Sequence, residues 1–84
     1  MAYAVTFKTS AVKQIKRLSK PVAERLLAKT DSLGQDPRPP GCLKLSGPSS
    51  LWRVRVGDYR IVYVIDDAGK KVDVRIIAHR REVY

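Results

Sequence analysis

Residues 51–66, LWRVRVGDYRIVYVID, predict two strands joined by a tight turn. Apolar residues alternate with arginine in the first half, and β-branched residues dominate the second, which is typical of strands. Gly57 and Asp58 separate the halves as a two-residue hairpin turn. A further turn at residues 67–70 leads to a third strand at residues 71–79. The stretch therefore indicates an antiparallel meander, around which the rest of the chain is arranged.

The chain before the meander begins with a strand and a short helix. Apolar side chains recur at every second position of residues 2–8, which predicts a half-buried strand. Residues 11–18 carry apolar side chains at helical spacing, and Thr9 or Ser10 is expected to cap this helix. The first strand is expected to pair with the meander, because its backbone N–H and C=O groups would otherwise have no partner strand.

A second helix and a stiff connector complete the chain. Pro21 suits the first turn of a helix, and Gly34 is expected as its C-cap. Residues 36–41, rich in proline, form a connector to a short segment at residues 43–46. The order is β-α-α-β-β-β, an α+β fold with a helical hairpin on one face of a twisted sheet. Residues 1–84 are too few for more than one domain.

The composition indicates a polyanionic partner. Lys and Arg number 17 against 8 acids, a net charge of +9. Both halves of the chain are basic, so the folded body carries the excess, which nucleic acid would neutralise. No apolar run approaches a spanning helix, and no signal-peptide core is present, so we expect a cytoplasmic protein without membrane contact. Cys42 and His79 are each the only residue of their type, so neither a disulfide nor a metal site is expected.

Strand alternation predicts which side chains share a face of the sheet. One face should carry Trp52, Val54, Val56, Ile61, Tyr63 and Ile65; the other should carry Arg53, Arg55, Arg60, Val62 and Val64. In the last strand, Arg75, Ile77 and His79 should alternate with Val72, Val74, Ile76 and Ala78. The helices are expected to cover the more apolar face. The opposite face then collects guanidinium groups, whose planar donors suit phosphate oxygens.

Other reactive side chains have plainer explanations. Lys70 and Lys71 lie at a turn, where we expect them to be solvent-exposed cations. We expect the Asp66-Asp67 pair to stabilise the same turn and not to form a catalytic site. Cys42 with His79 is an alternative nucleophilic pair, although nothing in the sequence orients such a base. Residues 79–84, HRREVY, combine an imidazole, two guanidinium groups and a phenol. That segment is either a frayed basic tail or part of a reactive site.

Three segments together resemble the RelE branch of the RelE/ParE superfamily of toxins from toxin–antitoxin systems. They are residues 44–47, KLSG; residues 51–63, LWRVRVGDYRIVY; and residues 79–84, HRREVY. The combination is specific, whereas each segment alone is weak. The resemblance covers almost the whole chain. It implies a microbial ribonuclease-like fold, with two helices against a four-stranded sheet, and a single toxin domain.

The resemblance also implies an activity and a set of site residues. It implies metal-independent endoribonuclease activity without a cofactor, in which the 2′-hydroxyl attacks the adjacent phosphate of mRNA in the A site of the small ribosomal subunit. The expected catalytic residues are Arg53, Arg55, Arg60, Arg80, Tyr84 and His79, and the expected RNA-binding residues are Lys44, Arg75 and Arg81. Tyr84 would act on the 2′-hydroxyl, and Arg53 and Arg60 would stabilise the pentavalent phosphate. Arg55 or Arg80 would approach the leaving oxygen, and His79 titrates nearest neutrality.

The implied partners are a RelB-like antitoxin, the ribosome and mRNA. Acidic groups of the antitoxin would neutralise the arginines while its helix covers apolar surface. Two alternatives stay open. One is a ParE-like inhibitor of DNA gyrase without ribonuclease activity, which shares the fold. The other is a non-catalytic basic RNA-binding module, which would bind RNA with a steep salt dependence and leave it intact.

Overall fold

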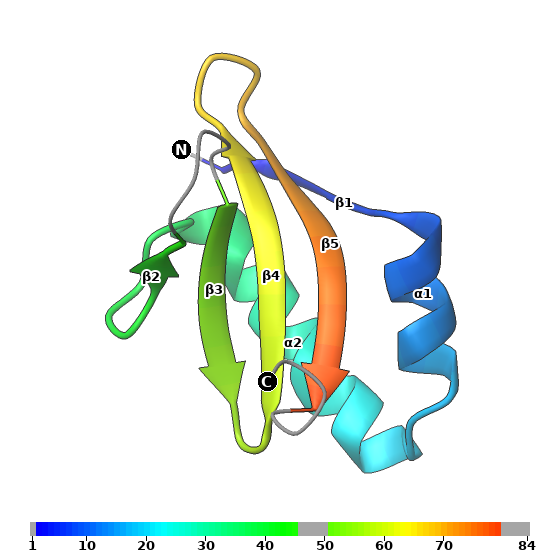
Figure 1. The fold of residues 1–84 in the computed structure, drawn as a ribbon. Helices are drawn as coiled ribbons and strands as arrows, with labels where there is room; N and C mark the ends of the chain where they lie inside the picture. The colour runs from blue at the N-terminus through cyan, green and yellow to red at the C-terminus, as the bar shows by residue number, and fades with distance from the viewer. Residues whose placement is uncertain (1, 46–50, 80–84) are drawn as a thin grey trace.

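The computed structural model describes residues 2–45 and 51–79. It has the predicted α+β class, with an N-terminal strand and two helices before the remaining strands (Figure 1). The elements are β1 (Ala4–Phe7), α1 (Thr9–Lys16), α2 (Lys20–Gln35), β2 (Leu43–Lys44), β3 (Leu51–Val56), β4 (Tyr59–Asp66) and β5 (Lys71–His79). No helix in the described part of the chain is long and apolar enough to cross a membrane.

The described strands form one mixed sheet in the order β1-β5-β4-β3-β2. The meander of β3, β4 and β5 is antiparallel, as predicted. The first strand does pair with the meander: β1 runs parallel to β5, with Ala4 opposite Lys71. At the other edge, the two-residue β2 pairs with Arg53 and Trp52 of β3. This edge strand makes the sheet five-stranded over the described residues, one strand more than the resemblance implied.

A register shift changes the predicted face of the last strand. Val62 lies opposite Ile76, but Tyr63 lies opposite Val74, so Arg75 is an extra residue in β5. Such a bulge reverses the alternation beyond it. Ile77 and His79 therefore share the face of Val72 and Val74, and the predicted grouping of Ile77 and His79 on the other face is wrong.

The core lies between the helices and one face of the sheet. Its buried apolar side chains are Ala11, Leu26, Leu33, Val54, Ile61, Tyr63, Ile65, Val72, Val74 and Ile77. In Figure 1, α2 crosses behind the sheet and α1 lies beside the β5 edge. Gln14 fixes α1 there, because its side-chain oxygen accepts a 2.9 Å hydrogen bond from the Ile77 N–H. The opposite face of β3 and β4 carries no helix.

The helix ends differ from the predicted caps. Lys8 rather than Thr9 or Ser10 is the N-cap of α1, and no side chain caps it. Pro21 lies in the first turn of α2, as predicted, but Gly34 lies inside this helix. The Gly34 carbonyl accepts a 2.6 Å hydrogen bond from the Tyr3 N–H. A Cβ at Gly34 would lie 3.0 Å from the Tyr3 carbonyl oxygen, so glycine allows α2 to approach β1 closely.

Candidate functional site

Three predicted arginines lie on the sheet face that faces away from the helices. Val54 of β3 is buried in the core, so Arg53 and Arg55 on either side of it point to the opposite face. Arg60 of β4 lies directly across from Arg55 in the strand register, beside the β3–β4 turn. We call Arg53, Arg55 and Arg60 the arginine surface.

The electrostatics of the arginine surface favour an anion. Like charges directly opposite each other on paired strands repel, and Arg55 and Arg60 occupy such positions. Arg60 is 8% exposed, whereas Arg55 is exposed. Arg53 and Arg55 form no ion pair with any residue in 2–45 or 51–79. A phosphate over this face of the sheet, beside the arginine side chains, would reduce the repulsion and accept several charge-assisted hydrogen bonds.

The β3–β4 turn sets the register that brings the arginines together. Gly57 has a φ of +58°, a conformation that suits glycine in a two-residue hairpin. A Cβ on Gly57 would lie 3.0 Å from Nη2 of Arg25, so the turn packs against α2. The turn therefore fixes Arg55 opposite Arg60 and ties both strands to the helix behind them.

A shallow hollow beside the arginine surface adds a cation that the sequence analysis missed. Lys29 of α2 and the connector residues Pro40 and Gly41 line it together with Arg53 and Arg55. β2 covers β3 only as far as Arg53, so the edge beyond it is open to this hollow. Lys29 is half-buried. A lysine at the border of an apolar helix face is the one signal that could have identified it.

Two of the predicted RNA-binding residues, Lys44 and Arg75, lie in the described strands. Neither is part of the arginine surface. Lys44 lies opposite Trp52 and so belongs to the helix side of the sheet. The Arg75 guanidinium lies 2.6 Å from the Asp73 carboxylate, which also accepts a hydrogen bond from Thr6. The structure therefore does not bring Lys44 into the arginine surface, and it pairs Arg75 with an acid on its own strand.

His79 lies on the helix side of the sheet and not with the arginines. It is opposite Tyr59, and the two rings meet edge to face with their centroids 5.2 Å apart. His79 and Tyr59 line neighbouring hollows, one with Val22 and Leu26 of α2 and the other with Gln14 of α1. The expected inclusion of His79 among the catalytic arginines therefore does not match its position. The register shift at Arg75 is the physical reason.

The remaining predicted site residues, Arg80, Arg81 and Tyr84, lie outside the described residues. The alternative pair of Cys42 and His79 does not form. Cys42 lies near the Tyr63 hydroxyl, whereas His79 lies opposite Tyr59, four positions away along β4. Four strand residues span about 13 Å. Within the described ranges, no three His, Cys, Asp or Glu side chains are close enough to hold a metal ion.

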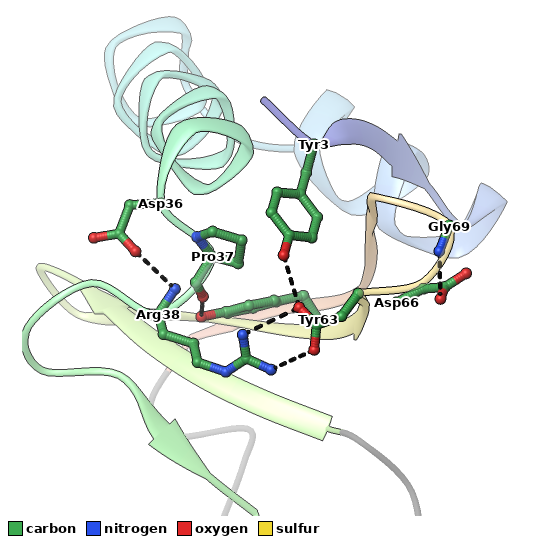
Figure 2. A network of polar contacts seen from close by, with 8 residues as sticks. Tyr3, Asp36, Pro37, Arg38, Tyr63, Asp66 and Gly69 are labelled. Atoms are coloured by element: carbon green, nitrogen blue, oxygen red, sulfur yellow. Dashed lines mark hydrogen bonds and ion pairs between the residues drawn. The ribbon is translucent and has the colours of Figure 1, made fainter. Parts of the chain in front are cut away.

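A polar network holds the connector at the other end of the sheet (Figure 2). The Tyr63 hydroxyl donates a buried 2.7 Å hydrogen bond to the Pro37 carbonyl. Arg38 donates to both carboxylate oxygens of Asp67, at 3.3 and 2.9 Å, and its guanidinium lies 5.0 Å from the Trp52 ring centre. Tyr3 donates to the same carboxylate at 2.7 Å. The network positions the connector that leads to Pro40, Gly41 and β2.

Two side chains of the network have pKa values that are shifted in opposite directions. Arg38, and then Tyr3, donate hydrogen bonds to the Asp67 carboxylate, which lowers the pKa of Asp67 to about 2. Burial raises the pKa of the Tyr63 phenol well above its usual range. Asp67 therefore stays ionised and Tyr63 stays neutral over the whole physiological range. These shifts belong to the structural network and not to the arginine surface.

Comparisons with known proteins agree with this architecture. Residues 5–84 match the family described as "ParE toxin of type II toxin-antitoxin system, parDE". The chain resembles RelE in the archaeal RelE–RelB complex from Pyrococcus horikoshii, with 30% identity and a TM-score of 0.85 over 95% of this chain and 97% of that one. It resembles the isolated Escherichia coli RelE toxin with 28% identity and a TM-score of 0.80, over 93% and 84%. No curated protein sequence is a significant match.

Proposed function

The chain belongs to the RelE/ParE superfamily of type II toxins, and we propose that it is a ribosome-dependent endoribonuclease that cleaves mRNA in the A site. The observation that carries this proposal is the arginine surface. Arg55 and Arg60 oppose each other across two strands, and Arg53 lies beside them on the same face. An inhibitor that acts only by binding a protein does not require three arginines on one face of the sheet.

In the proposed reaction, the mRNA 2′-hydroxyl loses its proton and its oxygen attacks the adjacent phosphorus. The bond from phosphorus to the 5′-oxygen breaks, and that oxygen gains a proton. The products are a 2′,3′-cyclic phosphate and a 5′-hydroxyl. Negative charge builds up on the pentavalent phosphate, and fixed positive charges stabilise such a state most effectively. Arg53, Arg55 and Arg60 supply those charges.

Proton transfer needs groups other than these arginines, because guanidinium keeps its proton above about pH 12. We assign Tyr84 as the base at the 2′-hydroxyl. Arg55 or Arg80, which the resemblance places near the leaving oxygen, would stabilise its negative charge, and a water molecule would supply its proton. His79 is left out of this mechanism, since it shares its face with Tyr59 and the helices. We further propose that the ribosome aligns the substrate.

We also propose an antitoxin as the partner that holds the protein inactive. The Pyrococcus horikoshii relative and an Escherichia coli relative were each solved with RelB. An acidic antitoxin segment would neutralise the arginine surface and so compete with mRNA. We expect the complex to be more stable than the isolated chain, because ligands that bind only the folded state stabilise it.

The match to a family named for ParE supports a second candidate function. Residues 5–84 match a family named for ParE, and a ParE-like inhibitor of DNA gyrase would share this fold. The two candidates make opposite predictions for the arginine surface. Removal of its charges should abolish mRNA cleavage by the ribonuclease, whereas it should leave inhibition of gyrase largely intact.

The deciding experiment uses ribosomes programmed with a defined mRNA and an empty A site, with RNA ends mapped by primer extension. The wild type should produce a new end inside the A-site codon and leave naked RNA intact. Arg60→Ala and the exposed Arg55→Ala should each lower the cleavage rate about 100-fold, as expected for one lost charge-stabilising donor. Lys71→Gln is the matched control. It removes one exposed charge at the start of β5, whereas Arg60 lies opposite Ala78 near the end of this strand. Circular dichroism checks that each variant is folded.

Uncut mRNA at every concentration of the wild type would overturn the proposal, and inhibition of gyrase would then favour the second candidate. Equal cleavage by Arg55→Ala, Arg60→Ala and the control would show that the arginine surface is not the site. Cleavage of naked RNA at the same positions would remove the ribosome from the mechanism.

A further inference from the structure

The outer side of α1 carries a second group of cations, well separated from the arginine surface. Lys13, Lys16 and Arg17 are spaced three and four residues apart, which places them on one side of a helix. Lys20 opens α2 directly after the short link. All four side chains are exposed. We call Lys13, Lys16, Arg17 and Lys20 the basic stripe.

The inner side of α1 holds the basic stripe in place. Ala11 is fully buried, and Ile15 and Leu18 pack on the core. The Gln14 side chain accepts a hydrogen bond from the Ile77 backbone N–H. Because α1 is fixed to β5 by these contacts, the stripe faces outward in one orientation. Figure 1 shows α1 beside β5 and β3 on the far side of the sheet, so the two basic surfaces lie on different sides of the molecule.

The basic stripe is electrostatically unbalanced. Residues 1–23 contain no Asp or Glu, and none of the four stripe residues forms an ion pair in the described part of the chain. Lys13 repels Lys16 and Arg17 at the spacing where opposite charges would stabilise a helix. The α1 dipole favours Lys13 and Lys16 in its last turn, but the α2 dipole disfavours Lys20 in its first turn.

A phosphate backbone is the partner that fits this pattern best. Protein interfaces need buried apolar surface at their centre, yet only Lys16 of the stripe lines the apolar hollow formed with Phe7, Val12, Ile15 and Leu27. Contact with phosphates requires cations alone, and flexible lysines serve as point charges for it. The remaining stripe residues therefore match nucleic acid more closely than they match a protein helix.

We propose that the basic stripe docks on the phosphate backbone of ribosomal RNA, as a contact separate from the one that holds mRNA. The proposal rests on the proposed function, because the ribosome is the RNA-containing body on which the chain would act. One side of the molecule would then bind the ribosome while the arginine surface receives the codon. The stripe would raise ribosome affinity without taking part in bond cleavage.

The test compares two variants of equal net charge. Lys13→Gln/Arg17→Gln removes two stripe cations that do not line the apolar hollow, and Lys70→Gln/Lys71→Gln removes two exposed lysines at the β4–β5 turn. Binding to ribosomes without mRNA is measured by sedimentation at several salt concentrations. The stripe variant should bind roughly tenfold more weakly, and its slope of log affinity against log salt should fall by about 2. The control should keep the wild-type slope.

Cleavage measurements separate this inference from the proposed function. On programmed ribosomes, the stripe variant should raise KM and keep kcat, since the arginine surface is unchanged. Equal affinities and slopes for both double variants would overturn the inference even if the wild type cleaves mRNA. Stripe-dependent ribosome binding by a wild type that never cleaves would uphold it while the proposed function fails. Unchanged ribosome binding with weakened antitoxin binding would overturn it and assign the stripe to the antitoxin.

Discussion

Replacing Tyr63 with phenylalanine tests whether the buried connector contact stabilises the fold. Tyr63 is fully buried, and its hydroxyl donates a 2.7 Å hydrogen bond to the carbonyl of Pro37, which is also buried. Tyr63→Phe keeps the ring but leaves this carbonyl without its donor. A lost buried hydrogen bond with an unsatisfied partner costs about 1–2 kcal/mol. In a domain of this size, that loss lowers Tm by roughly 5–15 °C.

Thermal unfolding followed by circular dichroism measures this loss, with Tyr3→Phe as the matched control. Tyr3 also loses a hydrogen bond from its hydroxyl, but to the exposed Asp67 carboxylate, so its Tm should fall much less. A second readout is the pH dependence. Burial raises the pKa of Tyr63 above its unfolded value, so wild-type stability falls as pH rises above about 10, and this fall should be smaller in Tyr63→Phe. Equal Tm values for the two variants would refute the reasoning, because water would then satisfy the Pro37 carbonyl.

Two further predictions concern side chains at opposite ends of the sheet, Asp67 and His79. The pKa of Asp67 is lowered by Arg38, so its contribution is present above about pH 4 and is lost as pH falls towards 2. The Tm of the wild type should therefore decline more steeply over that window than the Tm of Asp67→Asn, and parallel curves would contradict this assignment. His79→Gln should keep most of the mRNA cleavage that Arg60→Ala loses, since the histidine lies on the helix side. A loss as large as that of Arg60→Ala in the same primer-extension assay would return His79 to the mechanism.

The meander and the arginine surface were predictable because their signals are local. The period-two pattern of residues 51–66 and the Gly57-Asp58 turn specify two strands and their register. Because side chains alternate along a strand, Arg53 and Arg55 lie on the face opposite to Val54. The register of the hairpin then places Arg60 opposite Arg55. Residue type and alternation were sufficient for this part of the candidate site.

The misplacement of His79 came from a feature that alternation does not reveal. Ile76 and Ile77 are adjacent and both apolar, so either could have faced the core. The bulge at Arg75 buries Ile77, leaves Ile76 46% exposed, and turns His79 towards Tyr59. A bulge is decided by packing of the whole sheet on the helices, and a single strand sequence carries no clear signal for it.

Tertiary contacts also explain the other differences. Gly34 looked like a helix cap because glycine often ends helices, yet its role is to let α2 approach the Tyr3 carbonyl. Lys29 lies in the hollow beside Arg53 because α2 packs behind β3, and the helix sequence alone does not specify this packing. Pairing of β1 with β5 was expected only as pairing with the meander, because nothing local selects a parallel neighbour.

The pairing of β1 with β5 has a consequence for how the chain folds. Thr6 and Asp73 form a hydrogen bond although they lie 67 positions apart in the sequence. Closing a loop of that length costs about 4 kcal/mol of chain entropy before any contact offsets it. The hairpins of β3, β4 and β5 close much shorter loops, so they can form early and offer β5 as a template. We therefore expect β1 to join late and this nonlocal closure step to limit the folding rate of the domain.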